Sequence, residues 1–523
     1  MSSASLYTLP IELVYHIFDN LDVQTIFFSF RNVCKRFYTI VDIYNRYELD
    51  LSSVSKSEFH RICRIIRPEN VISLILSNND MTPGQICLFI SLFNIKQFVH
   101  LRALTLIEIE KFELNLLIEH ININSLNALS IKIRKNNSKS NDKSMISLLS
   151  NIVMANLHKF DLSMWSQEIN NIVWPKQCTL QYLTLGHYVT LKQVCEILRH
   201  LSHLRTLVLR NCIVNDTDGT MTSFSDIQTN THLTSLTLKN SRLQMNELEL
   251  LLSLTPSLVH LQLTGSVNLL DAILDGARWE EFIQIKLSSL KKFEFFFRTK
   301  TDINHNPIDI ESWVSPFRTM FWLKHKSWFV TCNFIIKTAT LRLYSVPICD
   351  PCITYESDFD KIVCTTCTAI ENDALIMNNV REVHLDLTLM MASITAQKVC
   401  YEKTKPKKFL WFKFISGFLI TLRSHHLFLK LTDLTLTING EWPADSMEFL
   451  SNLIDLTNLI TLGLYVDFDH CSVSNTINNI GYLLKQTYNV RSLTLSNSHY
   501  RSNLNGIVET RSYSSMPMLE CLL

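Results

Sequence analysis

A short pattern of apolar residues recurs along most of this chain and constrains its fold more than any other feature. An apolar residue, two variable residues, a second apolar residue, one variable residue and a third apolar residue follow one another in nine copies, which begin at Val71, Leu101, Leu126, Leu157, Leu180, Leu204, Leu233, Leu258 and Leu290. The starts lie about 23 to 32 residues apart, and helical spacing follows several copies, as at Val194 and Ile197. One such unit cannot bury its apolar side alone. The pattern therefore predicts stacked units, with parallel strands along one side and helices along the other.

Three copies carry a small or polar residue at the turn that leaves the strand, namely Cys212, Asn79 and Ser241. Such side chains fit the tight turn between stacked units. The copies resemble irregular leucine-rich repeats, and the resemblance implies an α/β solenoid with curved parallel strands inside and helices outside. An ordinary parallel α/β sheet with fortuitous leucines is the alternative.

The pattern loosens after residue 298. Strand cores reappear at Leu341, Val383, Leu434, Leu462 and Leu493, but their spacing stretches to about 42 to 51 residues before it returns to about 30. We therefore expect insertions, and the final residues, 519–523, look like half a strand, which favours an array truncated at its C-terminus. The expected organisation is an N-terminal helical domain at 1–48, a connecting or capping helix at 49–70, repeats at 71–298, repeats with long insertions at 299–430 and further repeats at 431–523.

Residues 6–38 predict three short helices. Pro10 begins the first, because a proline in the first turn lacks only an N–H that has no helical partner there. Asp22 caps a second helix, and a third carries Val33 and Phe37 on one face. The apolar face of the first helix is about 160° wide, while three short helices bury little surface by themselves. So wide a face on so small a bundle indicates a binding partner.

The residue order in this stretch resembles the F-box, the docking module that ties substrate receptors to the Skp-type adaptor of cullin-RING ubiquitin ligases. The resemblance is carried by Leu9-Pro10-x-Glu12-Leu13, Ile17-Phe18-x-x-Leu21 and Val33-Cys34-Lys35-Arg36-Phe37-Tyr38. The chain departs from the family at Phe37, where many members have Trp, and at the aromatic pair Phe27 and Phe28. The resemblance implies adaptor binding by Leu9, Pro10, Ile11, Leu13, Ile17, Phe18, Leu21, Val33, Cys34 and Phe37. A helical cap on the following domain is the alternative.

The resemblance further implies a substrate receptor of a Skp–cullin–F-box ligase, which is a non-catalytic subunit without a cofactor. The repeats then hold an unknown protein substrate, while ubiquitin comes from an enzyme recruited elsewhere in the complex. The strand residues expected to face that substrate are Arg205, Val208, Arg210, Ser235, Thr237, Lys239, His260 and Gln262. A leucine-rich scaffold that acts outside ubiquitination is the alternative.

Two Cys-x-x-Cys pairs lie among the expected insertions, Cys349 with Cys352 and Cys364 with Cys367. Paired cysteines of this kind are ligands of tetrahedral zinc. Neither pair carries the glycine that usually lets the backbone turn toward the sulfur atoms. We therefore expect no metal, and a structural zinc site at these four cysteines is the alternative.

Composition argues against several other classes of function. The formal net charge is +1 over 523 residues, so no global field attracts nucleic acid or an acidic membrane. The most membrane-like run, residues 409–422, contains Lys413 and falls short of the roughly 18 residues needed for a span, which predicts a buried helix instead. The 14 cysteines are scattered and no secretory signal is recognisable, which predicts an intracellular protein of the cytoplasm, the nucleus or both. We find no phosphate-binding loop, nucleophile elbow or His-Glu-x-x-His motif.

Overall fold

A computed structural model describes residues 6–79, 82–135, 143–153, 157–164, 172–175, 178–186, 188–213, 230, 232–300, 309–336, 338–355, 361–366, 377–392, 426–439, 441–443, 445–466, 473–490, 492–497 and 510–512. The chain forms two compact units: the first contains Met1–His260 and Lys286–Leu290, and the second contains Leu261–Ile285 and Lys291–Leu523. The predicted helix at 409–422, the predicted half-strand at 519–523 and Cys367 lie outside the described residues. Within the described ranges, no helix combines the length and the apolar character that crossing a membrane requires.

The first unit begins with short helices that aromatic side chains hold together. The ring of Phe30 packs edge-on against those of Phe18 and Phe37, with centroids 5.4 and 5.7 Å apart. The carboxylate of Asp22 accepts a hydrogen bond from the Thr25 N–H at 2.7 Å, which confirms the predicted cap. The second helical segment is irregular, a π-helical turn followed by a 3-10 turn. The elements are η1 (Leu6–Thr8), α1 (Ile11–Phe18), η2 (Thr25–Ser29), η3 (Phe30–Asn32) and α2 (Lys35–Ile43).

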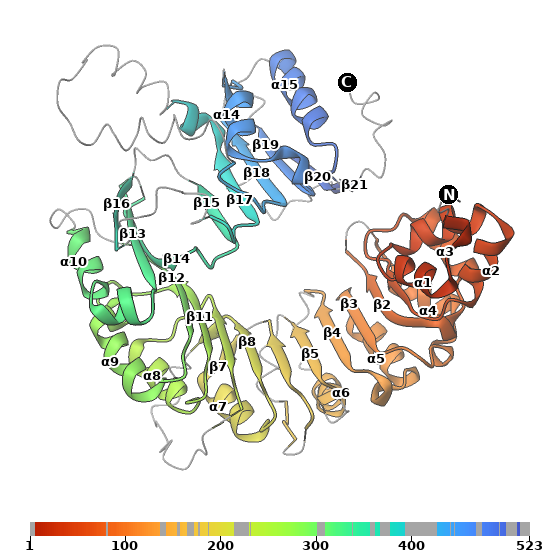
Figure 1. Ribbon diagram of the computed structural model, residues 1–523, viewed down its shortest axis with the longest axis horizontal. Helices are drawn as coiled ribbons and strands as arrows, with labels where there is room; N and C mark the ends of the chain where they lie inside the picture. The colour runs from red at the N-terminus through yellow and green to blue at the C-terminus, as the bar shows by residue number, and fades with distance from the viewer. Residues whose placement is uncertain are drawn as a thin grey trace. The chain divides into compact units, whose positions relative to one another are not determined.

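The strands that follow lie side by side in chain order, β1-β2-β3-β4-β5-β6-β8-β10, and each pairs in parallel with its neighbour. Helices lie along one side of these strands (Figure 1). Parallel neighbours need such crossovers, because the chain must return to the same end of the sheet. The strands are β1 (Tyr47–Asp50), β2 (Val71–Ser77), β3 (Ala103–Ile109), β4 (Ala128–Ile133), β5 (Lys159–Ser163), β6 (Tyr182–Leu185), β8 (Thr206–Arg210) and β10 (Ser235–Lys239), with a small separate pair β7 (Val189–Thr190) and β9 (Cys212–Ile213).

The leucine pattern forms the core of this parallel sheet. Its middle residues are partners across neighbouring strands, as Leu104 is of Leu129 and Leu183 is of Leu207, and each of these four is at most 1% exposed. The intervening residues point to the opposite, more exposed face, as the pleat of a strand requires. The predicted α/β class with parallel strands is therefore confirmed in this unit. The helices are α3 (Lys56–Ile65), α4 (Gln85–Leu92), α5 (Lys111–His120), α6 (Lys143–Val153), α7 (Leu191–His200) and α8 (Met245–Ser253), with 3-10 turns η4 (Pro68–Asn70), η5 (Ile95–Gln97) and η6 (Ile123–Ser125).

Buried polar or cysteine side chains follow several of the strands. Cys212 and Ser241, two of the predicted turn residues, are buried. After β2, however, the buried residue is Asn78 and not the predicted Asn79. Its side-chain amide donates hydrogen bonds to both carboxylate oxygens of Glu113, at 3.0 and 2.8 Å. The prediction was one residue off because the chain turns immediately after β2 ends.

The second unit departs from this regularity. Its strands β12, β14, β13 and β16 neighbour one another in that order and pair antiparallel, so the prediction of parallel strands is wrong here. Residues 336–339 join β13 directly to β14, and so short a connection permits only an antiparallel pair. Strands β15, β17, β18, β19 and β20 are again parallel, and β21 runs antiparallel to β20. The strands are β11 (His260–Ser266), β12 (Lys292–Lys300), β13 (Phe329–Ile335), β14 (Thr340–Val346), β15 (Cys352–Tyr355), β16 (Lys361–Thr365), β17 (Glu382–Asp386), β18 (Asp433–Ile438), β19 (Thr461–Val466), β20 (Ser492–Asn497) and β21 (Thr510–Ser512).

An aromatic cluster packs beside these antiparallel strands. Trp322 is fully buried, with its ring centroid 4.8 Å from that of Phe317 and 6.2 Å from that of Phe293. Its indole N–H donates to the carbonyl of Gly276 at 3.3 Å. A Cβ on Gly276 would lie 2.9 Å from the Phe317 ring, so only glycine fits there. The helical elements of this unit are η9 (Ala272–Leu274), α9 (Gly276–Lys286), α10 (Ile310–Val314), η10 (Ser315–Phe317), η11 (Phe321–His325), α14 (Ser446–Leu453), η13 (Leu456–Asn458) and α15 (Val473–Gln486).

Candidate functional site

Helix α1 carries an exposed apolar stripe beside its buried one. Val14 and Phe18 are buried, whereas Leu13 is 48% exposed and Ile17 is partly exposed. Leu13 and Ile17 lie four residues apart and are therefore neighbours on the helix surface. At about 100° per residue, Pro10 falls within about 60° of both. The helix thus presents apolar side chains to solvent as well as to its own core.

Contacts with α2 hold the segment that precedes α1. Arg36 donates a hydrogen bond to the backbone carbonyl of Leu9. Its guanidinium carbon also lies 5.6 Å from the ring centroid of Tyr7, an exposed residue that the sequence prediction did not include. These contacts hold Leu9 beside α2, and Leu9 stays partly exposed.

The turn before α2 supplies a second exposed apolar position. Cys34 occupies the N-cap of α2, so Val33 lies outside the helix and is 66% exposed. The prediction that Val33 shares a helical face with Phe37 is therefore wrong, because the helix begins later than its apolar spacing indicated. Tyr38, also exposed, is held by Arg31, which donates to its hydroxyl at 3.1 Å and lies 4.4 Å from its ring centroid.

Phe18 and Phe37, two of the predicted adaptor contacts, are internal. Each is 2% exposed and packs against Phe30, so both stabilise the domain and offer almost no surface to a partner. The other predicted adaptor contacts are at least partly exposed: Leu9, Pro10, Ile11, Leu13, Ile17, Leu21, Val33 and Cys34.

Strands β8 and β10 place most of the predicted substrate-binding residues on one face. Val208 is the strand partner of Thr237, and Arg210 is the partner of Lys239. Ser235 shares this face because side chains alternate along a strand. Thr237 is only 7% exposed, so it offers little contact surface.

The remaining predicted substrate-binding residues are placed differently. Arg205 precedes β8 and lies two residues before the buried Leu207, so strand alternation places both on the same face of the sheet. The side chain of Arg205 is nevertheless exposed. His260 and Gln262 lie on β11, and the Gln262 side-chain amide donates to the backbone carbonyl of Cys349 at 3.0 Å. The structure therefore does not bring Arg205 onto the face that carries Arg210.

A hollow of about 200 Å³ lies where several parallel strands of the first unit end. Three of its residues, Lys132, Arg210 and Lys239, are cationic. Gly186 also lines the hollow, and a Cβ there would lie 2.7 Å from the Cα of Ser163, another lining residue. The lining residues are Lys132, Ile133, Ser163, Gly186, Arg210, Asn211, Lys239 and Asn240.

Two carboxylates partly offset the cations of this hollow. Glu108 forms an ion pair with Lys132 at 2.8 Å. Burial raises the pKa of the Asp161 carboxyl on β5, while the nearby charge of Arg210 lowers it. With Lys239 included, cations outnumber carboxylates in this group, and the hollow favours a ligand with negative charge.

The sequence prediction included Arg210 and Lys239 but missed the other lining residues. A signal for three of them exists, since Lys132, Ser163 and Gly186 each follow directly after the third apolar residue of a copy. The register of the parallel strands from β4 to β10 converts that shared position into one row across the sheet. Asn211 and Asn240 come next and have left-handed backbones, with φ of 62° and 51°. Asparagine tolerates this conformation better than most side chains.

The described cysteines of the two Cys-x-x-Cys pairs do not converge on one zinc site. Cys352 lies on β15, which pairs with β17, whereas Cys364 lies on β16, which pairs with β13. Among the described residues, one group of three or more His, Cys or carboxylate side chains has its ligand atoms within 4.8 Å of one another, and it contains Cys352 but neither Cys349 nor Cys364. The fourth cysteine, Cys367, lies outside the described residues.

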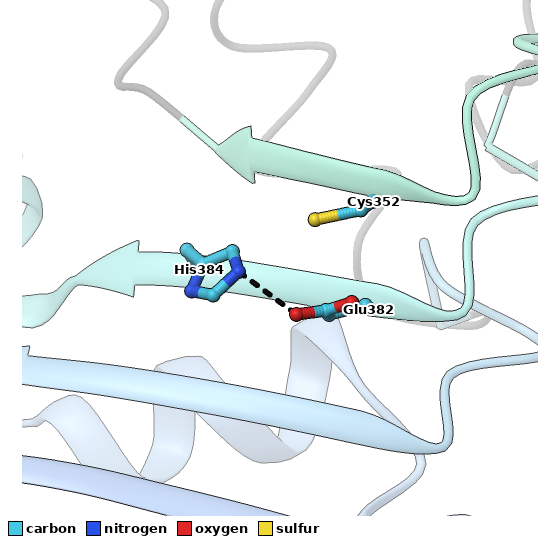
Figure 2. A group of neighbouring side chains, drawn as sticks. All are labelled: Cys352, Glu382 and His384. Carbon is cyan, nitrogen blue, oxygen red and sulfur yellow. Dashed lines mark hydrogen bonds and ion pairs between the residues drawn. The ribbon is translucent and has the colours of Figure 1, made fainter. Parts of the chain in front are cut away.

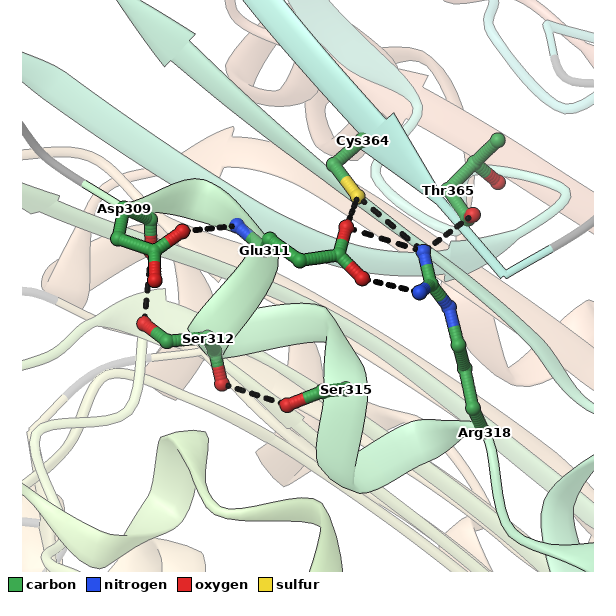
Figure 3. A network of polar contacts seen from close by, with 7 residues as sticks. All are labelled: Asp309, Glu311, Ser312, Ser315, Arg318, Cys364 and Thr365. Atoms are coloured by element: carbon green, nitrogen blue, oxygen red, sulfur yellow. Dashed lines mark hydrogen bonds and ion pairs between the residues drawn. The ribbon is translucent and has the colours of Figure 1, made fainter.

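Cys364 instead belongs to a polar network around α10 (Figure 3). Its thiol donates to the carboxylate of Glu311 at 2.9 Å, and Glu311 forms an ion pair with Arg318. Burial is the main cause that raises the pKa of Cys364 and Cys352 to about 11 and that of Cys349 to about 12. These thiols are therefore neutral near pH 7 unless a metal displaces the proton.

Comparison with known proteins agrees with the geometry of the N-terminal helices. A search of curated proteins finds no match to this chain. Residues 6–49 match the family model of the F-box domain. F-box domains bind Skp-type adaptors, and such a domain implies a part in substrate recognition by a ubiquitin ligase. The chain therefore contains an F-box domain at residues 6–49.

Proposed function

We propose that this protein is the substrate-recognition subunit of a cullin-RING ubiquitin ligase. Its F-box domain binds a Skp-type adaptor, and the exposed face of its parallel strands binds a protein substrate. The chain itself is non-catalytic and acts by raising the effective concentration of the substrate near the ubiquitin-carrying enzyme. Such a complex acts inside the cell, in the cytoplasm, the nucleus or both.

The observation that carries this proposal is the set of apolar side chains that the F-box domain exposes. Leu13 is 48% and Val33 is 66% exposed, although Phe18 and Phe37 beside them are buried. Full burial of one such aliphatic side chain contributes roughly 1.5 to 3 kcal/mol. Two or three of them, covered by a partner, suffice as the anchors of a specific interface.

We further propose that the parallel strands of both units are leucine-rich repeats. In the first unit, the pattern residues pair with one another from strand to strand. In the second unit, Val383, Leu434, Leu462 and Leu493 are successive partners across β17 to β20. A constant register of buried apolar residues, repeated at each strand, supports stacked repeats over an irregular α/β sheet.

The substrate is proposed to contact the exposed face of β4 to β10, with an acidic segment near the hollow. Arg210 and Lys239 lie opposite each other in the strand register, and Lys132 lines the same hollow. Complementary charge of this kind speeds encounter and selects among partners more than it adds affinity.

The first experiment measures the affinity of the whole purified chain for a Skp-type adaptor by titration calorimetry. The double variant Leu13→Ala, Val33→Ala removes two exposed anchors without opening a cavity in the core. We expect it to lose at least about 2 kcal/mol of binding free energy, roughly thirtyfold in Kd.

The matched control is Leu270→Ala, which truncates a leucine that is 92% exposed and lies outside the F-box domain. It should leave the adaptor affinity unchanged. If the intact chain shows no affinity for the adaptor, the helices act as a cap on the sheet and the proposal fails.

A scaffold that binds the adaptor but acts outside ubiquitination is the second candidate. Both candidates predict adaptor binding, so protein half-lives distinguish them. A receptor shortens the half-life of its substrate, and the variant Arg210→Ala, Lys239→Ala should lengthen it again without changing adaptor affinity. Unchanged half-lives across the proteome after removal of the chain favour the scaffold.

A further inference from the structure

Three side chains with metal-binding atoms meet on neighbouring strands of the second unit (Figure 2). Cys352 begins β15, and its strand partner on β17 is Glu382. His384 lies two residues farther along β17, so it points to the same face as Glu382. One ligand atom from each of the three lies within 4.8 Å of those of the other two.

The backbone under these side chains is well anchored. Ile353, Val383 and Leu385 alternate with them and are buried on the opposite face of the two strands. Arg298 donates to the carboxylate of Asp350 at 2.7 Å, two residues before Cys352. The strands therefore fix the backbone positions of the three residues before any ligand binds, which lowers the cost of assembling a site.

Contacts among the three side chains already bring their polar atoms together. His384 Nε2 lies 3.0 Å from a carboxylate oxygen of Glu382. The Cys352 thiol is also hydrogen-bonded to Glu382. A cation that replaces the shared protons would find a sulfur, a nitrogen and an oxygen ligand facing one point.

This donor set is selective for one class of metal. Magnesium and calcium prefer oxygen ligands only, whereas thiolate and imidazole together suit zinc. Zinc is commonly bound by three protein ligands, with the fourth tetrahedral position left to water or another ligand. We propose that Cys352, Glu382 and His384 bind a zinc ion, with the fourth position open to water. The thiol proton leaves to solvent when the zinc–sulfur bond forms.

Such an ion would join β15 to β17. Strand β15 is the edge of its sheet, with β17 as its neighbour in the order β15-β17-β18-β19-β20-β21. A zinc bridge between the two strands would stabilise that edge in addition to the backbone hydrogen bonds. The site is independent of the proposed ubiquitin-ligase function, and its ligands differ from the four-cysteine arrangement that the sequence suggested.

The test is a titration of the whole chain, freed of metal with a chelator, with Co²⁺ as a spectroscopic substitute for Zn²⁺. A cysteine ligand gives a thiolate-to-cobalt charge-transfer band in the near ultraviolet. We expect this band to saturate at one equivalent and to disappear when Zn²⁺ is added. Cys352→Ser should abolish it, and His384→Ala and Glu382→Gln should each weaken the metal affinity by at least about tenfold, since even supporting partners of metal ligands contribute that much.

The matched control is Cys364→Ser, which removes a cysteine of the Glu311 network and should leave the band intact. Circular dichroism identifies any variant that fails to fold. Glu382→Gln preserves the shape of the side chain, so it still tests the site if another variant does not fold. Absence of a band in the parent chain, its survival in Cys352→Ser, or its loss in Cys364→Ser would each overturn the proposal. The last result would favour paired Cys-x-x-Cys knuckles instead.

Discussion

The parallel strands of the first unit and the antiparallel strands of the second differ in how they are connected and in which side chains they bury. In the first unit each strand reaches its neighbour through a crossover, and the buried side chains are mainly leucines in register, such as Leu183 beside Leu207. In the second unit β13 turns directly into β14, and large rings such as Trp322 and Phe317 fill the core beside these strands.

The difference shows what a repeated pattern can and cannot enforce. The crossovers differ in length, yet the strand register keeps each buried leucine of the pattern opposite a buried apolar residue of the next unit. Strands β13 and β14 are joined without a crossover, and no row of leucines runs from one to the other. A few aromatic rings supply most of the buried apolar area beside them instead. We therefore expect core stability in the antiparallel region to depend on fewer residues.

The largest expected effect is on the stability of the second unit, because a few aromatic rings make up the core beside its antiparallel strands. Trp322→Ala removes a fully buried ring from the aromatic cluster and should lower the free energy of unfolding of the second unit by about 4 kcal/mol. Chemical denaturation monitored by circular dichroism measures it. Trp328→Ala is the control, because Trp328 is partly exposed and its loss should cost clearly less. Equal losses for the two variants would contradict a core centred on Trp322.

A smaller effect tests how closely the parallel strands pack. Gly186→Ala places a Cβ 2.7 Å from the backbone Cα of Ser163, and we expect a loss of about 1 to 3 kcal/mol from overpacking. Gly481→Ala in α15 meets no atom within 4 Å and should instead stabilise that helix by about 0.5 to 1 kcal/mol. The two variants, compared by thermal unfolding, should therefore shift in opposite directions. A gain in stability from Gly186→Ala would show that the strands can move apart.

The smallest expected effect is a pH dependence at the exposed face of the parallel strands. Burial raises the pKa of Asp161 in the folded protein, so the ionised carboxylate opposes folding above that pKa and has no such effect below the unfolded value of about 3.9. Asp161→Asn should therefore raise stability at pH 7 and lose this advantage as the pH falls toward 4. Urea unfolding at both pH values measures it. Thr105→Ala, on β3 two strands from Asp161, is the control and should show no pH-dependent difference.

Local features of the sequence were sufficient for much of the fold. Apolar alternation identified the buried residues of the parallel strands, and the proline and aspartate signals located the N-terminal helices. The mixed α/β class, its mainly parallel strands and the N-terminal F-box domain were predicted correctly on this basis. The spacing of apolar residues indicates which side chains share a face of one helix or strand. Capping residues such as Asp22 indicate where a helix begins, because their hydrogen bonds are local.

The sites depended on contacts between elements, which spacing does not encode. The sequence marked Phe18 and Leu13 alike as apolar positions of one helix, but packing against Phe30 turned the first inward and left the second exposed. It marked Arg210 and Lys239 separately, and strand register placed them opposite each other.

The sequence by itself thus determined which residues are apolar, where the parallel strands of the first unit form, and that residues 6–49 resemble an F-box domain. The tertiary structure decided which strands become neighbours, and with it the row of cations at the hollow and the meeting of Cys352 with His384. The physical reason is that alternation and helical periodicity act over a few residues, whereas strand partners here lie tens of residues apart in the chain.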